Sequence, residues 1–341
     1  MKHIFLIHSH ALLLTALGVT ARENIHKEDV IFIYSRNYKN VLPIDFIFFD
    51  FSTEIEDTFY IMLSWSRRHF LLDKENRNRS VYFFDKFIAE NAAVGYYLYV
   101  CQLQAYTNQI LATNSLCQEC FFIQEGGRVM FPLLTDHISW FCRLYNAIVL
   151  KGEKRLWKMS NWFPNKKTPY NRPIIAYAFD KSYFGNMPQE IRIVKWPKVN
   201  LDISIDISRP IFVLEGAVEL GQVESPLYEK AVKKLVSEFA SEKNYIKFHP
   251  KNGDIAKEKY KSFFYDKKVE IEELPMDIPF ELILTNFDSL KLYGSGTSLL
   301  FYGKALGHQV ISREEYLLSS VRYRTYVKGL QILDCVSIMR K

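Results

Sequence analysis

The sequence predicts an α/β protein made of two Rossmann-like domains whose parallel sheets face a central cleft. Three observations lead to this class. Short apolar runs of strand length alternate with helix-length segments, which is typical of parallel sheets covered on both faces. An irregular, proline-punctuated stretch interrupts the alternation, which then restarts. A length of 341 residues suits two domains of ordinary size.

The first domain, with the irregular connection that follows it, is expected over residues 1–200. It begins with a strand from His3 to His8, a turn at Ser9 and a helix from His10. A signal peptide is the other interpretation of this start, since Val19-Thr20-Ala21 resembles a cleavage site, but histidines interrupt the apolar run. The remaining expected elements are strands at 30–34, 45–49, 96–100 and 121–123, and a helix over 102–113.

The second domain is expected over residues 201–341. Its expected strands are 210–214, 245–248, 282–284 and 291–293, with helices over about 226–241 and from about 299. Ligands of such sheets bind beyond the carboxyl ends of the strands. The residues that follow each strand are therefore the candidates for a binding site.

The composition excludes several classes of protein. Hydrophobic residues at 48% and aromatic residues at 15% are too many for a disordered chain. The net charge of +6 is too small for a dedicated nucleic-acid binder, and the chain contains no nucleic-acid recognition motif, so no nucleic-acid partner is expected. Beyond the first residues, no segment has the apolar character of a membrane span.

The cysteines indicate a reducing compartment. Five cysteines, an odd number in a large chain, favour reduced thiols and a cytoplasmic location. Cys117 and Cys120 form a C-x-x-C pair, but only His137 and Cys142 are candidates for the second pair that a zinc site would need. We therefore expect these cysteines to be buried core thiols.

A glycine-rich turn, Gly294-Ser295-Gly296-Thr297-Ser298, follows a predicted strand and precedes a predicted helix. Its backbone N–H groups, its hydroxyls and the positive end of the helix suit a phosphate. A glycine turn with a helix-capping hydroxyl is the alternative. The chain has no G-x-x-x-x-G-K-[ST], which excludes a P-loop nucleotidase.

Two other ionisable residues follow predicted strands. The ring of His249, before Pro250, can donate to a phosphate oxygen or protonate a leaving group, and a structural histidine is the alternative. Glu125 precedes two glycines that leave room for a substrate, and it can act as a general base, or cap a surface turn. No D-x-D occurs, which favours a metal-independent transfer or no transfer at all.

Taken in order, these pieces resemble the bacterial sialyltransferases of the GT-B type, the group of lipooligosaccharide sialyltransferases and capsular polysialyltransferases. The family's acidic-acidic-Gly motif resembles Gln124-Glu125-Gly126, its His-Pro motif resembles His249-Pro250, and its Ser/Thr pair resembles Thr297-Ser298. The stretch 272–282 is similar to the family's segment between the last two motifs. One position departs from the family pattern, because Gln124 stands where the family has its first acid.

The resemblance implies a GT-B fold and an inverting transfer of sialic acid from CMP-sialic acid to a hydroxyl of a cell-surface glycan. The expected acceptor is a terminal galactose or sialic acid of lipooligosaccharide or capsule. Glu125 would take the proton of the acceptor hydroxyl, and His249 would stabilise the departing CMP. No metal or other cofactor is expected. The residues expected to bind substrate are Ser9, His10, Gly126, Pro250, Glu281, Gly294, Ser295, Gly296, Thr297 and Ser298.

Some of these assignments have alternatives. Glu281 resembles a nucleotide-recognition residue but also suits the first turn of a helix. Ser9 and His10 are expected to line the acceptor site, where His10 competes with Glu125 as the base, or to form a turn and a helix cap. Two other functions stay open for the whole chain: a GT-B transferase that uses another nucleotide sugar such as CMP-Kdo, and a non-catalytic glycan-binding or capsule-assembly protein.

The positive charge of the chain is concentrated in one segment. Residues 151–172 hold seven basic residues and one acidic residue, which accounts for the whole net charge of +6. Trp157, Trp162 and Phe163 lie among them. We hypothesise that this segment binds the anionic inner face of the plasma membrane, or an anionic acceptor, and a solvated loop is the alternative.

Overall fold

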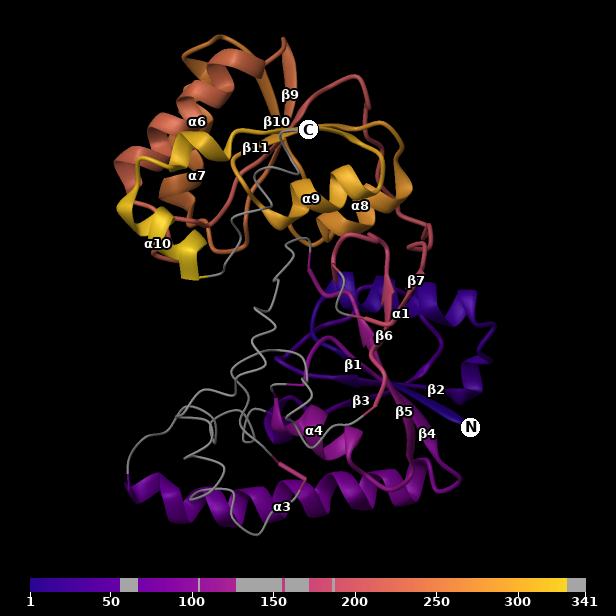
Figure 1. Cartoon of the computed structure of the whole chain (residues 1–341). Coiled ribbons are helices and arrows are strands. Elements are labelled where there is room, and N and C mark those ends of the chain that lie inside the picture. The colour runs from indigo at the N-terminus through magenta and orange to yellow at the C-terminus, as the bar shows by residue number, and fades with distance from the viewer. Residues whose placement is uncertain (56–66, 104, 127–154, 157–171, 186–187, 330–341) are drawn as a thin grey trace. The chain divides into compact units, whose positions relative to one another are not determined.

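The computed structural model describes residues 1–55, 67–103, 105–126, 155–156, 172–185 and 188–329 (Figure 1). For 67–77 and 327–329 it describes only the helical backbone. The chain divides into two compact units. The first is Met1–Glu125 with Phe131–Trp196, and the second is Gly126–Met130 with Pro197–Lys341. The principal boundary between them therefore falls between Trp196 and Pro197.

Within the described residues, the first unit contains a seven-stranded sheet in the order β3-β2-β1-β4-β5-β6-β7, and every neighbouring pair is parallel. Helix α1 covers one face, and α3 and α4 cover the other (Figure 1). The strands are β1 (Lys2–Ile7), β2 (Val30–Tyr34), β3 (Ile47–Asp50), β4 (Tyr96–Val100), β5 (Cys117–Ile123), β6 (Ile175–Ala178) and β7 (Glu190–Ile193). The helices are α1 (His10–Arg22), α3 (Arg67–Asn91) and α4 (Tyr106–Ala112), with a 3-10 turn η1 (Lys27–Asp29).

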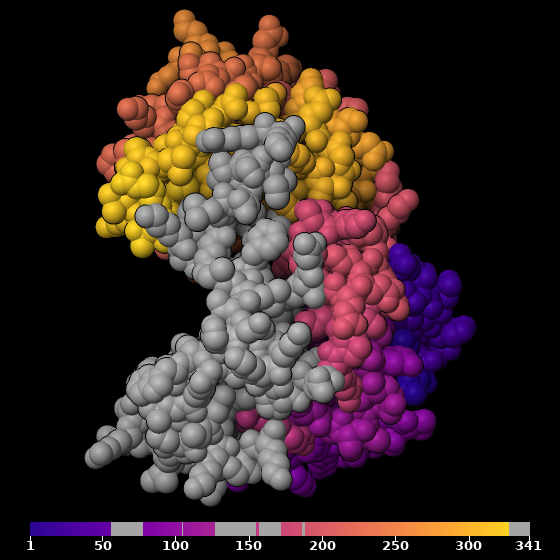
Figure 2. Space-filling view, viewed as in Figure 1, coloured from indigo at the N-terminus to yellow at the C-terminus, as the bar shows by residue number. Residues whose placement is uncertain are grey.

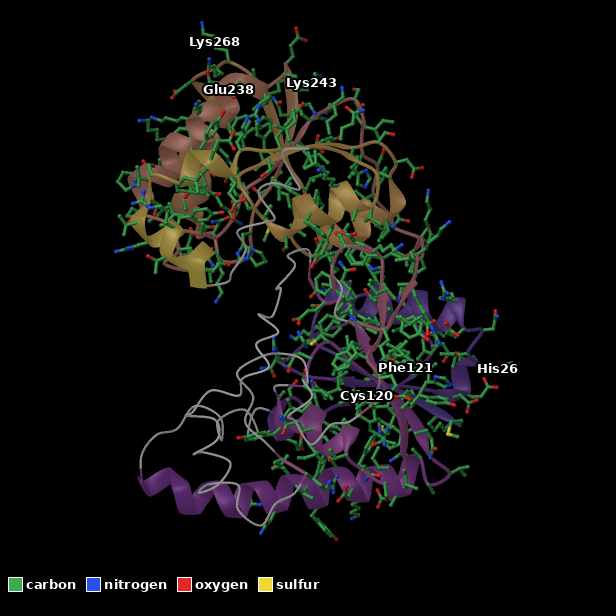
Figure 3. All side chains as sticks on the ribbon, in the orientation of Figure 1. His26, Cys120, Phe121, Glu238, Lys243 and Lys268 are labelled. Atoms are coloured by element: carbon green, nitrogen blue, oxygen red, sulfur yellow. The ribbon has the colours of Figure 1, made fainter. Side chains whose placement is uncertain are left out.

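Burial explains why the central strands could be read from the sequence. All five residues of β2 are buried, and Ile4 to Ile7 of β1 are buried too. A strand covered on both faces needs apolar side chains in both directions, so it appears as an uninterrupted apolar run. Cys117 and Cys120 of β5 are also buried, as expected from the sequence. Figure 3 shows Cys120 in the first unit and His26 at its surface.

A hydrogen-bonded junction joins α1 to the end of β5 and to the end of the first unit. The hydroxyl of Thr15, which is fully buried, donates to the carbonyls of Ala11 and Gln124. The indole Nε1 of Trp196 donates to the same hydroxyl at 3.0 Å. This junction fixes the backbone directly before Glu125, because Gln124 is the residue that accepts from Thr15.

The second unit contains a five-stranded sheet within the described residues, in the order β10-β9-β8-β11-β12, with all pairs parallel. Helices α6 and α7 lie together on one face, and α8 and α9 lie together on the other (Figure 1). The strands are β8 (Ile211–Val213), β9 (Lys243–Lys247), β10 (Glu270–Glu273), β11 (Lys291–Gly294) and β12 (Gln309–Ser312). The helices are α6 (Ser225–Phe239), α7 (Asp254–Tyr265), α8 (Phe280–Asn286), α9 (Ser298–Ala305) and α10 (Val321–Gly329), with a 3-10 turn η2 (Glu314–Leu317). In Figure 2, residues near the C-terminal end of the described chain, coloured yellow, form much of the visible surface of this unit.

One predicted element is wrong. Residues 282–284 do not form a strand but lie within helix α8. Leu282, Ile283 and Leu284 are all buried, and a short apolar run of this kind does not reveal by its periodicity whether it is a buried strand or a buried helix. Pro279 at the N-cap is the local signal that favours the helix, because a proline has no N–H to leave unpaired at a helix start.

Four strands were not predicted, and three of them have a common explanation. β7, β10 and β12 are outer strands of their sheets, and their side chains are mostly half-buried or exposed. Such strands need no continuous apolar run. β6 is buried, but it lies in the proline-punctuated stretch that was interpreted as a connection. That stretch in fact completes the sheet of the first unit.

The predicted α/β class with two Rossmann-like parallel sheets is confirmed, and these are the component domains of the GT-B class. In both sheets the strand order reverses direction at the first strand, which is the doubly wound arrangement. No described helix combines the length and the apolar character needed to cross a bilayer.

Candidate functional site

The carboxyl ends of the strands of the first unit meet at one edge of its sheet. β1 pairs with β2 on one side and with β4 on the other, so the crevice at which the winding reverses lies between β1 and β4. His8 follows β1, Cys101 follows β4, and Glu125 lies just beyond β5. The sheet therefore gathers three chemically active side chains from distant parts of the sequence at its switch point.

His8 and Glu125 are hydrogen-bonded to each other through Nε2 of the imidazole and Oε1 of the carboxylate. The side chain of His8 is 9% exposed and that of Glu125 is 21% exposed. An ionised carboxylate can only accept, so Nε2 of His8 carries the shared proton. The imidazole therefore fixes the orientation of the carboxylate while part of Glu125 stays open to solvent.

The surroundings of Glu125 keep it ionised. Burial acts to raise the pKa of Glu125, but the hydrogen bond and charge of His8, the hydrogen bond from Cys101 and the charge of Arg36 outweigh it. The pKa of this carboxyl consequently lies below its ordinary value. At neutral pH the group is a carboxylate, the form that can accept a proton.

Cys101 is the third member of this group. It is 7% exposed, and burial is the main cause that raises the pKa of its thiol well above the ordinary value. One ligand atom from each of His8, Cys101 and Glu125 lies within 4.8 Å of the other two. Imidazole, thiol and carboxylate are all ligands that zinc accepts.

The turn after β2 places a positive charge at the same edge. Arg36 and Asn37 have φ angles of 59° and 54°, in the left-handed region that residues other than glycine rarely adopt. The backbone N–H of Asn37 donates to the hydroxyl of Ser52 at 2.8 Å, which holds the turn. Strained backbone of this kind is common at functional sites. The sequence offered no signal for it, because neither residue is a glycine.

Ser9 and His10 have the turn-and-cap role that was the alternative for them. Ser9 is the N-cap of α1, and its hydroxyl accepts from the N–H of Leu12 at 3.3 Å. Nδ1 of His10 is hydrogen-bonded to the hydroxyl of Tyr38 at 2.8 Å. Burial lowers the pKa of His10 to about 4, so its ring is neutral at physiological pH. A role of these residues toward an acceptor stays a prediction.

Gln124, the departure from the family motif, has a structural role. Its side chain is fully buried, and its Oε1 accepts from the backbone N–H groups of Phe179 and Asp180, both at 3.1 Å. Gln124 thus joins the end of β5 to the loop after β6. Gln124 is thereby held in the interior, whereas the side chain of Glu125, the next residue, is 21% exposed. Gly126, the next residue, is half-buried.

The second unit has its switch point between β8 and β11. Glu215 follows β8 by two residues, and Ser295 follows β11 directly. The hydroxyl of Ser295, which is 5% exposed, donates to Oε1 of Glu215 at 2.8 Å. The backbone N–H of Glu215 donates to the hydroxyl of Tyr228. Ser295 was expected to bind phosphate, and here its hydroxyl holds two strand ends together.

His249 is the second residue after β9, and a backbone N–H group fixes the tautomer of its ring. The N–H of Lys251 donates to Nδ1 of the ring at 3.1 Å, so the proton of the neutral imidazole is on Nε2. Burial is the main cause that lowers the pKa of His249. The ring therefore offers one N–H donor at neutral pH, which suits a phosphate oxygen.

Asn252 is a site residue that the sequence did not reveal. It is 4% exposed, and its Oδ1 accepts from the backbone N–H of His249 at 2.9 Å. Its Nδ2 donates to the carbonyl of Glu215 and to Oε1 of Glu219. Asn252 therefore ties the end of β8 to the end of β9 and holds the backbone of His249. An Asn three residues after a His-Pro turn was its only sequence signal.

Thr297 and Ser298 form the start of α9. Thr297 is the N-cap, and its hydroxyl accepts from the N–H of Leu299 at 3.3 Å. Gly296 has a φ of 136°, which a side chain would strain, so the glycine allows the turn. Thr297 and Ser298 are half-buried, and the first N–H groups of the helix lie there. The predicted turn and helix cap are present, and phosphate binding stays a prediction.

Glu281 lies in the first turn of α8 near a buried lysine. Nζ of Lys247, whose residue is 6% exposed, donates to the carbonyls of Pro275 and Ile278. Burial lowers the pKa of Lys247 to about 8, against the charge of Glu281, which raises it. Burial raises the pKa of Glu281. Pro250, another of the residues expected to bind substrate, is exposed.

Most of the basic segment 151–172 lies outside the described residues. Two of its members are described, and both bind protein groups. Arg155 makes two hydrogen bonds to the carboxylate of Asp85, at 2.7 Å and 3.0 Å. Arg172 donates to the carbonyls of Cys117 and Gln118. Membrane contact through this segment stays a prediction.

Comparisons with known proteins give likenesses of fold. No family model and no curated protein matches the chain. MurG from Acinetobacter baumannii is 9% identical, with 99% of this chain and 93% of that chain covered and a TM-score of 0.43. The UDP-GlcNAc 2-epimerase from Methanocaldococcus jannaschii is 10% identical, with coverages of 94% and 92% and a TM-score of 0.45. The spinosyn rhamnosyltransferase SpnG, complexed with thymidine diphosphate, is 10% identical, with coverages of 96% and 84% and a TM-score of 0.47. Values this low carry no assignment of residues or substrates.

Proposed function

We propose that this chain is an inverting glycosyltransferase, and specifically a sialyltransferase that moves sialic acid from CMP-sialic acid to a hydroxyl of a cell-surface glycan. A terminal galactose or sialic acid of lipooligosaccharide or capsule is the proposed acceptor. One observation carries the proposal. Glu125, at the switch point of the first sheet, is a carboxylate with a lowered pKa, oriented by His8 and still partly exposed.

The proposed reaction is a single displacement. Glu125 accepts the proton of the acceptor hydroxyl as the oxygen attacks the anomeric carbon, and the bond to the CMP phosphate breaks. His8 does not take the proton itself in this proposal. It donates to Glu125 and so keeps the carboxylate ionised and directed.

The departing phosphate needs stabilisation of negative charge. His249 offers the N–H of its Nε2, because the amide of Lys251 occupies Nδ1. The start of α9 offers backbone N–H groups and the hydroxyl of Ser298. Donors that are already fixed in place stabilise a leaving group without reorganisation, so we propose that the transfer needs no metal.

The roles of the other expected substrate residues follow from their positions. Glu281 is proposed to bind the nucleotide, since it lies at the start of α8. Gly126, beside Glu125, leaves space for the acceptor. Ser9 and His10 shape the acceptor side by holding α1 and Tyr38 in place. A cytoplasmic enzyme with 151–172 on the anionic membrane surface is part of the same proposal.

The test is transfer from CMP-sialic acid to a panel of galactosides and sialosides, analysed by mass and linkage. Glu125→Gln keeps the size of the side chain but removes the base, so we expect transfer to be abolished while calorimetry shows CMP binding close to that of the wild type. Glu119→Gln is the matched control, a carboxylate of the same strand whose Oε1 accepts from the N–H of Cys120. Near-normal transfer by Glu125→Gln would eliminate Glu125 as the base.

The same panel distinguishes the rivals. Transfer from CMP-Kdo, but not from CMP-sialic acid, would identify a different transferase. Glycan binding without affinity for CMP would identify a non-catalytic protein. We expect unchanged transfer in the presence of EDTA, and a strict requirement for Mn²⁺ would contradict the proposed mechanism.

A further inference from the structure

The described part of the chain contains one group of three metal-ligating side chains whose ligand atoms converge, namely His8, Cys101 and Glu125. The three residues come from the ends of three adjacent parallel strands, β1, β4 and β5. Neighbouring strand ends are rigidly spaced by the hydrogen bonds of the sheet. The three residues lie within two positions of these strand ends, so the sheet sets the spacing of the chain segments that carry them.

The distances fit a first-row transition metal. Each ligand atom lies within 4.8 Å of the other two. Zinc bonds of about 2.0–2.3 Å place two of its ligands roughly 3–4 Å apart, so the spacing of these ligand atoms is close to that of a zinc site. His8 and Glu125 already touch through Nε2 and Oε1, the two atoms that would bind the ion.

The chemistry of the ligands selects zinc over harder cations. Magnesium and calcium prefer sites made of oxygen atoms, whereas a thiolate and an imidazole favour zinc. Three protein ligands leave the fourth position of a tetrahedral ion to water. Cys101 is 7% exposed and lies away from the surface, whereas Glu125 keeps 21% exposure as the open side of the site.

We propose that His8, Cys101 and Glu125 form a zinc-binding site, and that zinc bound there inhibits the enzyme. Binding forms bonds from the metal to Nε2 of His8, Sγ of Cys101 and a carboxylate oxygen of Glu125. The thiol proton of Cys101 and the proton shared by His8 and Glu125 leave to solvent, and no group is oxidised or reduced. The zinc binding is independent of the proposed transferase activity. The inhibition alone rests on that proposed function, because a metal-bound Glu125 cannot accept the proton of the acceptor hydroxyl.

Zinc binding is tested on the full chain with the metal alone. Chelator-treated protein is titrated with Zn²⁺ in competition with a chromogenic chelator, and we expect one ion per chain. Cys101→Ala and His8→Leu should each weaken binding by at least about 10–100-fold, since even the loss of an outer-shell partner costs that much. Cys117→Ala is the matched control, a buried free thiol of the same sheet outside the group.

A spectroscopic measurement identifies the ligand directly. Co²⁺ in place of zinc should give a thiolate-to-cobalt charge-transfer band that is lost in Cys101→Ala and kept in Cys117→Ala. If Cys101→Ala does not fold, the loss of affinity in His8→Leu and the band of the wild type decide the matter. Absence of the band in the wild-type protein, or equal zinc affinity in the wild type and the two site variants, would overturn the site.

The inhibition has its own measurement. We expect micromolar Zn²⁺, but not Mg²⁺, to suppress transfer, and EDTA to restore it. Zinc binding in a chain that transfers no sialic acid would refute the proposed function alone. Transfer that is unaffected by saturating zinc would refute the inhibition alone.

Discussion

A β-carbon on Gly216 would lie 2.6 Å from Nδ1 of His249 and 3.1 Å from Cγ of the same ring. The imidazole thus rests directly on the backbone that follows β8. No side chain larger than hydrogen fits at position 216 without displacing the ring or Lys251, whose Cβ would lie at 3.2 Å. The end of one strand therefore sets the position of the histidine at the end of the next.

Gly216→Ala should lower transfer in the same way as a replacement of His249 would. The methyl group would push the ring off its hydrogen bond with the N–H of Lys251, so we expect transfer to fall by about 10²-fold, the scale for a charge-stabilising group. Transfer kinetics and a melting curve check this. Gly253→Ala, where a β-carbon would meet nothing within 4 Å, should transfer normally. Normal activity of Gly216→Ala would show that the position of His249 is unimportant.

His8→Leu should raise the pKa of Glu125. Burial, which acts to raise that pKa, would no longer be opposed by the hydrogen bond and charge of His8. The acidic limb of the pH profile of kcat/KM should therefore move to higher pH. The pKa of Glu125 is lowered in the folded wild type, so its ionisation stabilises the protein at pH values above the unfolded pKa. This stabilisation is lost as the pH falls through the folded pKa.

The control for His8→Leu is His26→Leu. His26 is an exposed histidine of the first unit, and its Nδ1 lies 3.9 Å from Oε1 of Glu28. Its replacement should leave the pH profile unchanged. A profile of His8→Leu that coincides with that of the wild type would mean that His8 does not set the ionisation of Glu125.

Ser295→Ala should destabilise the second unit. It removes the donor of a buried hydrogen bond to Glu215, which is 9% exposed, and the loss of a partner for a buried group costs about 1–3 kcal/mol. Ser208→Ala removes a similar hydrogen bond, from an exposed serine to Asp206, and should cost little. Denaturant unfolding measures both variants. Equal stability of the two would show that the Ser295–Glu215 bond does not hold the strand ends.

Gln124→Glu restores the acid of the family motif, yet we expect it to destabilise the protein and not to raise transfer. The side chain is fully buried, and burial would raise the pKa of the new carboxyl. The cost, about 1–3 kcal/mol or more, should appear as pH rises above the unfolded pKa of about 4.3 and vanish below it. Gln118→Glu, on an exposed position of β5, is the control for urea unfolding against pH. A faster enzyme would contradict the structural role of Gln124.

Several parts of the site were predictable because they are local. Ser9 before a helix, the turn at 294–298 and the position of Glu125 after an apolar strand depend on neighbours in the sequence. The strand predicted at 282–284 failed for the same reason, since a short apolar run suits a buried strand and a buried helix equally. The outer strands were missed because exposed positions do not require apolar residues.

The rest of the site depends on contacts between distant residues. The hydrogen bond between His8 and Glu125 spans 117 positions, and that between Ser295 and Glu215 spans 80. The sequence contains a C-x-x-C pair, yet the cysteine near Glu125 is Cys101. No spacing rule links such residues, because the order of strands in the sheet decides which of them become neighbours.

The sequence by itself determined the α/β class, the two sheets and the residues that follow their strands, since local apolar patterns decide which segments become buried strands. The tertiary structure alone decided what those residues do. It buried Gln124 in hydrogen bonds that connect the end of β5 to the loop after β6, and it oriented the carboxylate of Glu125 through His8. It also placed the thiol of Cys101 beside that carboxylate. The physical reason is that orientation, burial and pKa depend on groups brought together by the pairing of the strands.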